Sequence, residues 1–183
     1  MSRAAKDDLT GFRRASTSSL EVRYRDADHC IGWLANVQLI LSRQPPTSEF
    51  MRRIISELNA LANDLRCGTG ALLIIRAGMR PPSEEARRFI QAELARSAML
   101  GAAQVVEGSG FTAAAMRAAL SMLQLVARPP YPMKVFSDIP QASGWLCQEL
   151  AERAHRNPDP RELADVALEL RSAFLMNPSV RPP

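Results

Sequence analysis

The sequence predicts an α/β fold in which an N-terminal hairpin and several parallel strands form one mixed sheet, with an additional helix at the C-terminus. Short apolar segments at 71–75 (ALLII) and 102–106 (AAQVV) alternate with longer segments whose apolar residues recur at helical spacing. A continuous apolar run such as ALLII is typical of a parallel strand that helices cover on both faces. The 183 residues suit one domain with some additional segments.

The first expected element is the hairpin. Residues 20–24 (LEVRY) alternate between apolar and polar side chains, as a half-buried strand does. Residues 25–28 (RDAD) predict a turn, and residues 29–34 (HCIGWL) can return as a second, antiparallel strand. Residues 37–41 either extend that second strand or form a third one.

Helices and strands then alternate. The first helix follows two prolines, with Thr47 or Ser48 as its N-cap, and Gly68 is expected to be its left-handed C-terminal cap. The strand at 71–75 comes next, and residues 81–85 (PPSEE) are expected to begin a second helix, because acidic residues favour a helix N-terminus.

After the strand at 102–106, Thr112 is expected to cap a third helix. The spacing predicts that its inward stripe consists of Met116, Ala119, Leu120, Leu123 and Val126. Residues 133–136 (MKVF) are expected to form the last strand, followed by a fourth helix at about 140–155. The inward side chains of that fourth helix are expected to be Ala142, Trp145, Leu146 and Leu150.

A fifth helix is expected from Pro160, with Asp159 as its N-cap. Its apolar stripe consists of Leu163, Val166, Leu170 and Phe174. This stripe can pack against the protein's own sheet or against a second copy of the chain. The expected domain organisation is a flexible arm (1–18), the α/β domain (19–156), this extra helix (157–176) and a Pro-rich tail (177–183).

Composition excludes several classes of protein. The net charge of +4 is small and spread along the chain, which does not indicate a nucleic-acid partner. We expect no secretory leader and no membrane span, because no apolar run is long enough for one. Three cysteines without close pairing favour a reducing, cytoplasmic location without disulfides, and no spacing predicts a metal site or a cofactor.

A family resemblance rests on two segments of the chain. The first is residues 103–106 (AQVV), which precede a helix, and the second is residues 132–138 (PMKVFSD), which precede Ala142, Trp145 and Leu146. The chain resembles STAS-type domains, the sulfate-transporter and anti-sigma-factor-antagonist group, and is similar to single-domain bacterial proteins of that fold. The resemblance covers residues 20–155 by architecture and is most specific in 131–150.

The resemblance implies a STAS-like mixed sheet and a function without catalysis. Domains of this family are generally not enzymes and bind protein partners, often kinases or regulators. We therefore expect a regulatory or scaffold module that acts by protein–protein interaction in bacterial signalling, with a homodimer as one form. No cofactor is implied.

Two serines are candidate phosphoacceptors or partner-facing residues. Ser83 lies near the position at which several members of the family are phosphorylated, although residues 76–83 (RAGMRPPS) replace the usual Asp-Ser-Ser/Thr-Gly-Leu turn. A plain helix N-cap is the alternative for Ser83. Ser16 follows two arginines in the N-terminal arm and resembles a basophilic kinase target.

Two groups of residues are candidate contact sites. The first is a glycine-containing turn between a strand and a helix, which can bind an anion or be only a tight turn; it consists of Gly108, Ser109, Gly110 and Thr112. The polar sides of the first two helices carry a candidate partner-facing basic patch, for which a solvated surface is the alternative; it consists of Arg52, Arg53, Arg87 and Arg88.

Two further functions stay open. Plentiful apolar residues allow a small-molecule or lipid-binding module. An enzyme using Cys30, Cys67 or a carboxylate is the other alternative, although the sequence offers no catalytic set, and Cys30 and Cys147 are expected to be small core residues.

Overall fold

The computed structural model describes residues 19–76, 78–79, 85, 88, 92, 99–154 and 157–176. Its elements are, in chain order, β1 (Glu21–Arg25), β2 (His29–Leu34), β3 (Val37–Ser42), α1 (Ser48–Leu65), β4 (Thr69–Arg76), β5 (Met99–Glu107), α3 (Gly110–Ala127), β6 (Met133–Phe136), α4 (Ile139–Ala151) and α5 (Pro160–Met176). The expected second helix lies outside the described residues apart from three isolated positions. The proposed arm and Pro-rich tail lie outside them too, so both stay predictions.

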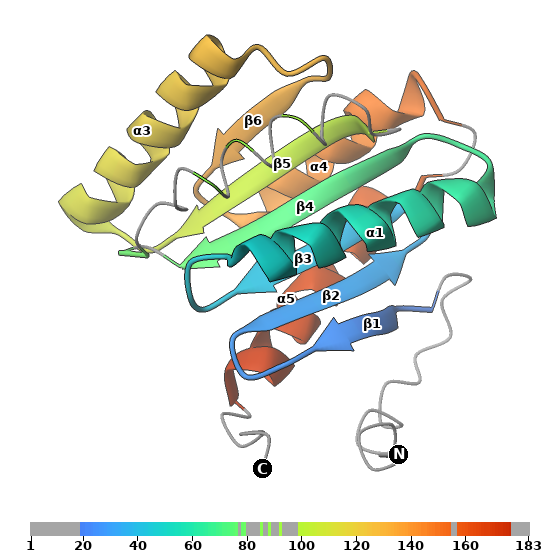
Figure 1. Ribbon diagram of the computed structural model, residues 1–183, viewed down its shortest axis with the longest axis horizontal. Helices are drawn as coiled ribbons and strands as arrows, with labels where there is room; N and C mark the ends of the chain where they lie inside the picture. The colour runs from blue at the N-terminus through green and yellow to red at the C-terminus, as the bar shows by residue number, and fades with distance from the viewer. Residues whose placement is uncertain are drawn as a thin grey trace.

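The strands form one six-stranded mixed sheet in the order β1-β2-β3-β4-β5-β6 (Figure 1). The first three strands are antiparallel, and β3 to β6 are parallel. The predicted fold class is therefore confirmed. Residues 37–42 form a separate third strand, because the chain reverses between Leu34 and Val37, where Ala35 adopts a positive φ of 51°.

Helices cover both faces of this sheet, and each face has its own apolar core. On the face under α1, side chains of that helix pack on alternate residues of β2 to β5, among them Ile31, Ile40 and Ala71. On the opposite face, α4 and α5 pack on the other alternate set, which includes Leu39, Leu72 and Val105. Figure 1 shows α1 in front of the sheet and α4 and α5 behind it. This two-sided burial explains why the parallel strands are continuously apolar.

The C-terminal helix α5 packs within the same chain. Asp159 caps it by accepting hydrogen bonds from the backbone N–H groups of Arg161 (2.8 Å) and Glu162 (3.2 Å). Its buried side chains join the core behind the sheet; they are Leu163, Ala164, Ala167, Leu170 and Phe174. The apolar stripe that the sequence left without a partner thus covers the sheet beside α4.

Several local predictions are wrong in detail. Helix α1 ends at Leu65, and its C-cap residue, Arg66, adopts the left-handed conformation (φ 49°) expected of Gly68. Gly68 is instead required by close packing, because a Cβ there would lie 2.3 Å from Leu100 Cγ. Helix α4 ends at Ala151, short of the expected residue 155. Its Trp145 is half-buried and packs against the core behind the sheet, as the sequence predicted.

Helix α3 also differs from its prediction. It begins at Gly110 with Ser109 as the N-cap residue, so Thr112 lies in its first turn and does not cap it. Of the predicted inward stripe, Met116 and Leu120 are half-buried and Ala119 is exposed. None of the described helices is both long and apolar enough to cross a membrane.

Candidate functional site

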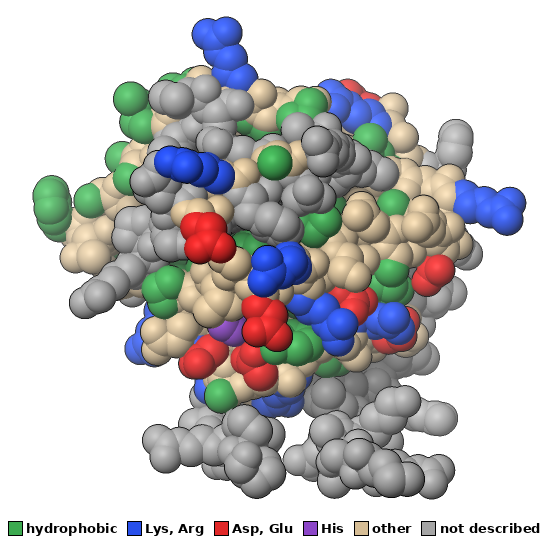
Figure 2. Space-filling model, in the orientation of Figure 1, with side chains coloured by type: hydrophobic (Ala, Val, Ile, Leu, Met, Phe, Trp, Pro, Cys, Tyr) green, Lys and Arg blue, Asp and Glu red, His purple; other side chains and the backbone are tan. Residues whose placement is uncertain are grey.

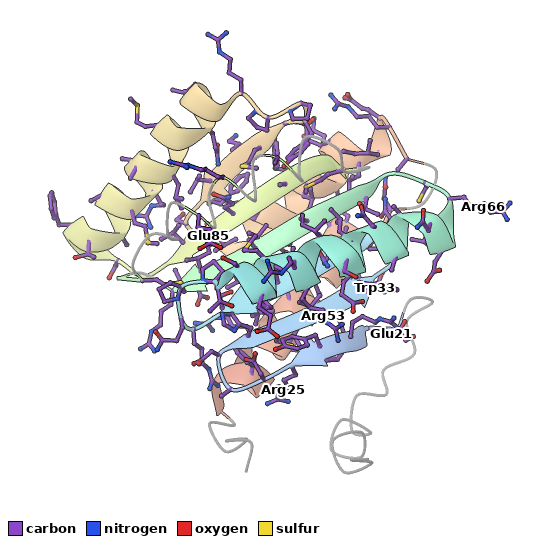
Figure 3. All side chains as sticks on the ribbon, viewed as in Figure 1. Glu21, Arg25, Trp33, Arg53, Arg66 and Glu85 are labelled. Atoms are coloured by element: carbon purple, nitrogen blue, oxygen red, sulfur yellow. The ribbon has the colours of Figure 1, made fainter. Side chains whose placement is uncertain are left out.

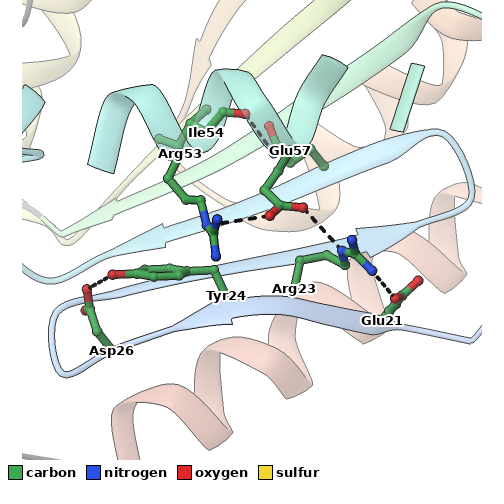
Figure 4. Close-up of polar contacts among 8 residues, drawn as sticks. Glu21, Arg23, Tyr24, Asp26, Arg53, Ile54 and Glu57 are labelled. Atoms are coloured by element: carbon green, nitrogen blue, oxygen red, sulfur yellow. Dashed lines mark hydrogen bonds and ion pairs between the residues drawn. The ribbon is translucent and has the colours of Figure 1, made fainter. Parts of the chain in front are cut away.

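The predicted basic patch contains an internal ion-pair network. Glu57, a buried residue of α1, receives a hydrogen bond from Arg23 Nε at 3.2 Å and lies 3.5 Å from Arg53 Nε (Figure 4). Arg53 also lies over the ring of Tyr24, with its guanidinium carbon 5.3 Å from the ring centroid. Arg53 therefore contributes to the packing of α1 on the hairpin, as Figure 3 also shows. Arg52 and Arg88 are exposed, and Arg87 lies outside the described residues.

The turn before His29 is fixed by Asp26. One carboxylate oxygen accepts from the backbone N–H groups of Asp28 (2.7 Å) and His29 (2.6 Å), and the other accepts from the Tyr24 hydroxyl at 2.5 Å. Burial opposes ionisation of Asp26, but these hydrogen bonds outweigh it and lower its pKa. The His29 ring stacks on Phe50 with centroids 3.9 Å apart, so it serves the core.

The thiols at two of the three cysteines are poorly suited to nucleophilic chemistry. Cys30 and Cys147 are buried, as the sequence predicted for core residues, and burial raises the pKa of each to about 12. A thiolate is the reactive form, and at such a pKa almost none is present near neutral pH. Cys67 is partly exposed. Within the described part of the chain, no three His, Cys, Asp or Glu side chains are grouped so that they could hold a metal ion.

The candidate anion-binding turn joins β5 to α3. Gly108 and Gly110 both have positive φ values, 112° and 81°, which explains why glycine occupies these positions. Arg117 holds the turn by donating from Nη1 to the carbonyls of Val106 (3.2 Å) and Gly108 (3.4 Å). The four predicted residues, Gly108, Ser109, Gly110 and Thr112, are all exposed. Anion binding by this turn stays a prediction, as does phosphorylation of Ser16 and Ser83, which lie outside the described residues.

A cleft of about 530 Å³ lies at the carboxyl ends of three neighbouring parallel strands, beside α5. We call it the carboxyl-edge cleft. It is lined by residues at or just after the ends of β3, β4 and β5 and by two residues of α5: Leu41, Ser42, Arg43, Ile74, Arg76, Glu107, Gly108, Arg171 and Phe174. The sequence predicted only Gly108 of this set as a candidate site residue.

Three arginines of the carboxyl-edge cleft differ in how they are held. Arg171 forms an ion pair with Glu107. Arg43 donates from Nη1 to the Ala27 carbonyl at 3.1 Å and from Nη2 to the Phe174 carbonyl, and its guanidinium carbon lies 4.3 Å from the centroid of the Phe174 ring. Arg76 is exposed, and no described side chain pairs with its guanidinium.

The outer side of α3 exposes several apolar side chains, and we call this surface the α3 face. Phe111 is 89% exposed, Met122 62% and Leu125 69%. The positions between them are filled by exposed alanines: Ala114, Ala115, Ala118 and Ala119. The one charged residue of the helix, Arg117, bonds to the turn before it. Figure 2 shows apolar side chains projecting along this edge of the molecule.

Comparison with known proteins identifies no relative by sequence. No protein-family model matches the chain, and no curated protein is similar to it. Its fold is similar to the crystal structure of an uncharacterized protein from the DUF3478 family, with a SpoIIAA-like fold, from Shewanella loihica PV-4. That similarity covers 74% of this chain and 99% of the other, at 15% identity and a TM-score of 0.48. The likeness is one of fold alone.

Proposed function

We propose that the protein is a non-catalytic regulatory or scaffold module that acts by protein–protein contact, and that the α3 face is its contact surface. The observation that carries the proposal is the exposed apolar surface of Phe111, Met122 and Leu125. The largest exposed apolar patch of a monomeric protein measures about 300–600 Å² and is often functional. The buried, weakly acidic thiols of Cys30 and Cys147 argue against catalysis by those two cysteines.

The three large side chains lie on one line along the helix. Met122 and Leu125 follow Phe111 by 11 and 14 residues, which is close to three and four turns at 3.6 residues per turn. They therefore point to the same side of α3. Burying each of them against a partner contributes roughly 1.5–3 kcal/mol.

A second copy of the chain is the occupant that fits this surface. Because the α3 face is uncharged, a partner must present an uncharged apolar surface too, and the same face of another copy does so. The alanines let two helices approach closely. An antiparallel pair about a two-fold axis brings Phe111 of each copy toward the Leu125 end of the other.

The helix is a better contact element than the neighbouring strand. Strand β6 lies at the sheet edge beside α3 (Figure 1), and its middle carries the exposed Lys134. A short edge strand with a lysine disfavours edge-to-edge pairing of sheets. Association through α3 avoids that obstacle.

The size of the surface predicts a reversible dimer. A helix of 18 residues is about 27 Å long and about 10 Å wide, so its face covers about 270 Å². Stable interfaces bury about 800 Å² per partner. The dimer should therefore dissociate on dilution, as transient signalling contacts do.

The test is the molar mass of the full chain in solution, measured by sedimentation from about 10 μM to about 1 mM, a range that brackets weak association. We expect the mass of the wild-type protein to rise from one chain toward two, and Leu125→Glu to stay monomeric. The matched control is Leu168→Glu, because Leu168 is an exposed leucine (39%) on α5. This control should dimerise as the wild type does. A monomer at every concentration, or equal behaviour of the two variants, would refute the proposal.

A further inference from the structure

We propose that the carboxyl-edge cleft binds an organic anion, a small molecule that carries a phosphate or carboxylate group. This inference goes beyond the proposed function, because the cleft lies at the α5 side of the sheet and shares no residue with the α3 face.

The position of the cleft is the first argument. Ser42, Arg76 and Glu107 are the last residues of β3, β4 and β5, and these strands are parallel neighbours. In open sheets of α/β proteins, ligands bind in the crevice outside the carboxyl ends of the strands. A volume of about 530 Å³ suits a small organic molecule, because ligand pockets usually measure about 300–1,000 Å³.

The charge of the cleft is the second argument. Arginines reach it from three separate elements: Arg43 follows β3, Arg76 ends β4 and Arg171 belongs to α5. The single carboxylate of the lining, Glu107, neutralises Arg171.

The other two guanidinium groups keep their charge. The hydrogen bonds of Arg43 go to uncharged backbone carbonyls, and no described side chain pairs with Arg76. Two positive charges therefore converge on one hollow, and guanidinium groups bind carboxylates and phosphates in a bidentate manner.

The floor of the cleft is the third argument. It is formed by Leu41, Ile74 and Phe174, which are 2%, 4% and 3% exposed and belong to the core behind the sheet. The Phe174 ring is held under the guanidinium of Arg43. The three apolar side chains are almost wholly covered by the protein itself, so they form a fixed, water-poor backing that strengthens the attraction between the guanidinium groups and an anion.

The experiment is calorimetric titration of the full chain with four probes of matched length or charge. These are octyl phosphate, octanoate, octanol, which lacks the charge, and inorganic phosphate, which lacks the apolar body. We expect octyl phosphate or octanoate to bind at least about tenfold more tightly than octanol, and more tightly than inorganic phosphate, since only they combine a charged group with a body that fills the cleft. The stronger of the two amphiphiles identifies the headgroup. If neither binds, or if octanol or inorganic phosphate binds as tightly, the proposal is wrong.

Two variants locate the binding in the cleft. Arg76→Gln removes an exposed charge without breaking an ion pair between described side chains, and it should weaken binding about tenfold. Arg161→Gln, an exposed arginine at the other end of α5, is the control and should bind as the wild type does. Ser42→Asp adds a negative charge to the lining and should abolish binding while every arginine remains. Equal affinity of Arg76→Gln and Arg161→Gln, or unaltered binding by a folded Ser42→Asp protein, would place the ligand elsewhere and overturn the assignment.

Discussion

Replacing Glu57 by glutamine tests whether the arginines of the predicted basic patch stabilise the fold. The carboxylate of Glu57 lies between Arg23 and Arg53, at 3.2 and 3.5 Å, and links α1 to strand β1. Glutamine keeps the size and shape of the side chain but removes its charge. If the network holds the hairpin against α1, the free energy of unfolding must fall.

The expected loss follows from the exposure of the three side chains. Glu57 is 10% exposed, whereas Arg23 and Arg53 are 36% and 49% exposed. Exposed ion pairs contribute about 0.2–1 kcal/mol, and breaking a buried pair costs about 3–5 kcal/mol. A buried carboxylate between two half-exposed arginines lies between these limits, so we expect a loss of about 2 kcal/mol. For a chain of this size that lowers Tm by about 4–8 °C.

The measurement is thermal and urea denaturation of Glu57→Gln and of Glu169→Gln, whose carboxylate is exposed on α5. The control should lose less than about 0.5 kcal/mol. A double-mutant cycle with Arg23→Gln then isolates the pair, because the effect of Glu57→Gln should shrink when Arg23 is already absent. A loss no greater than that of the control, or an effect unchanged in the Arg23→Gln background, would refute the stabilising role of the network.

Two more predictions concern the core. Gly70→Ala places a Cβ 2.8 Å from Leu150 Cδ1, so it should cost about 1–3 kcal/mol in urea denaturation. The cost of Gly70→Ala should largely disappear when Leu150 is replaced by alanine. If the costs of the two substitutions add instead, the packing argument is wrong. Because burial raises the pKa of Cys30 and Cys147 to about 12, iodoacetamide at pH 8 should label Cys67 first in the native protein and all three thiols in denaturant. Rapid labelling of Cys30 or Cys147 in the native protein, measured by peptide mass, would contradict this prediction, because it would show that the surroundings of that thiol open to solvent.

The order of strands and helices was predictable because each element carries its own signal. The residues of β2 and β6 agree with the predicted 29–34 and 133–136, since turn residues border both strands. Burial of α3 was harder to predict. A helix with one charged residue has no polar side to show which side faces inward, so spacing alone assigned Ala119 to the core although it is exposed.

The carboxyl-edge cleft was missed for a different reason. Its arginines come from elements far apart in the sequence, and no local motif joins Arg43, Arg76 and Arg171. One signal was present: in parallel strands, the residues that end each strand meet at the same edge of the sheet. Reading the residues after 37–41, 71–75 and 102–106 together would have placed Arg43, Arg76 and Glu107 side by side.

The two proposed surfaces can be tested independently, since each principal variant changes a residue of one surface only. Leu125 lies on the α3 face and Arg76 in the cleft, so Leu125→Glu should leave octyl phosphate affinity unchanged, and Arg76→Gln should leave dimerisation unchanged. The described contact between the surfaces runs through Arg117 of α3, which bonds to the carbonyl of Gly108 in the cleft lining. This bond is long and exposed, and such bonds contribute little. We therefore expect ligand binding and self-association to be additive, and a dimer whose dissociation constant shifts several-fold with octyl phosphate would contradict that independence.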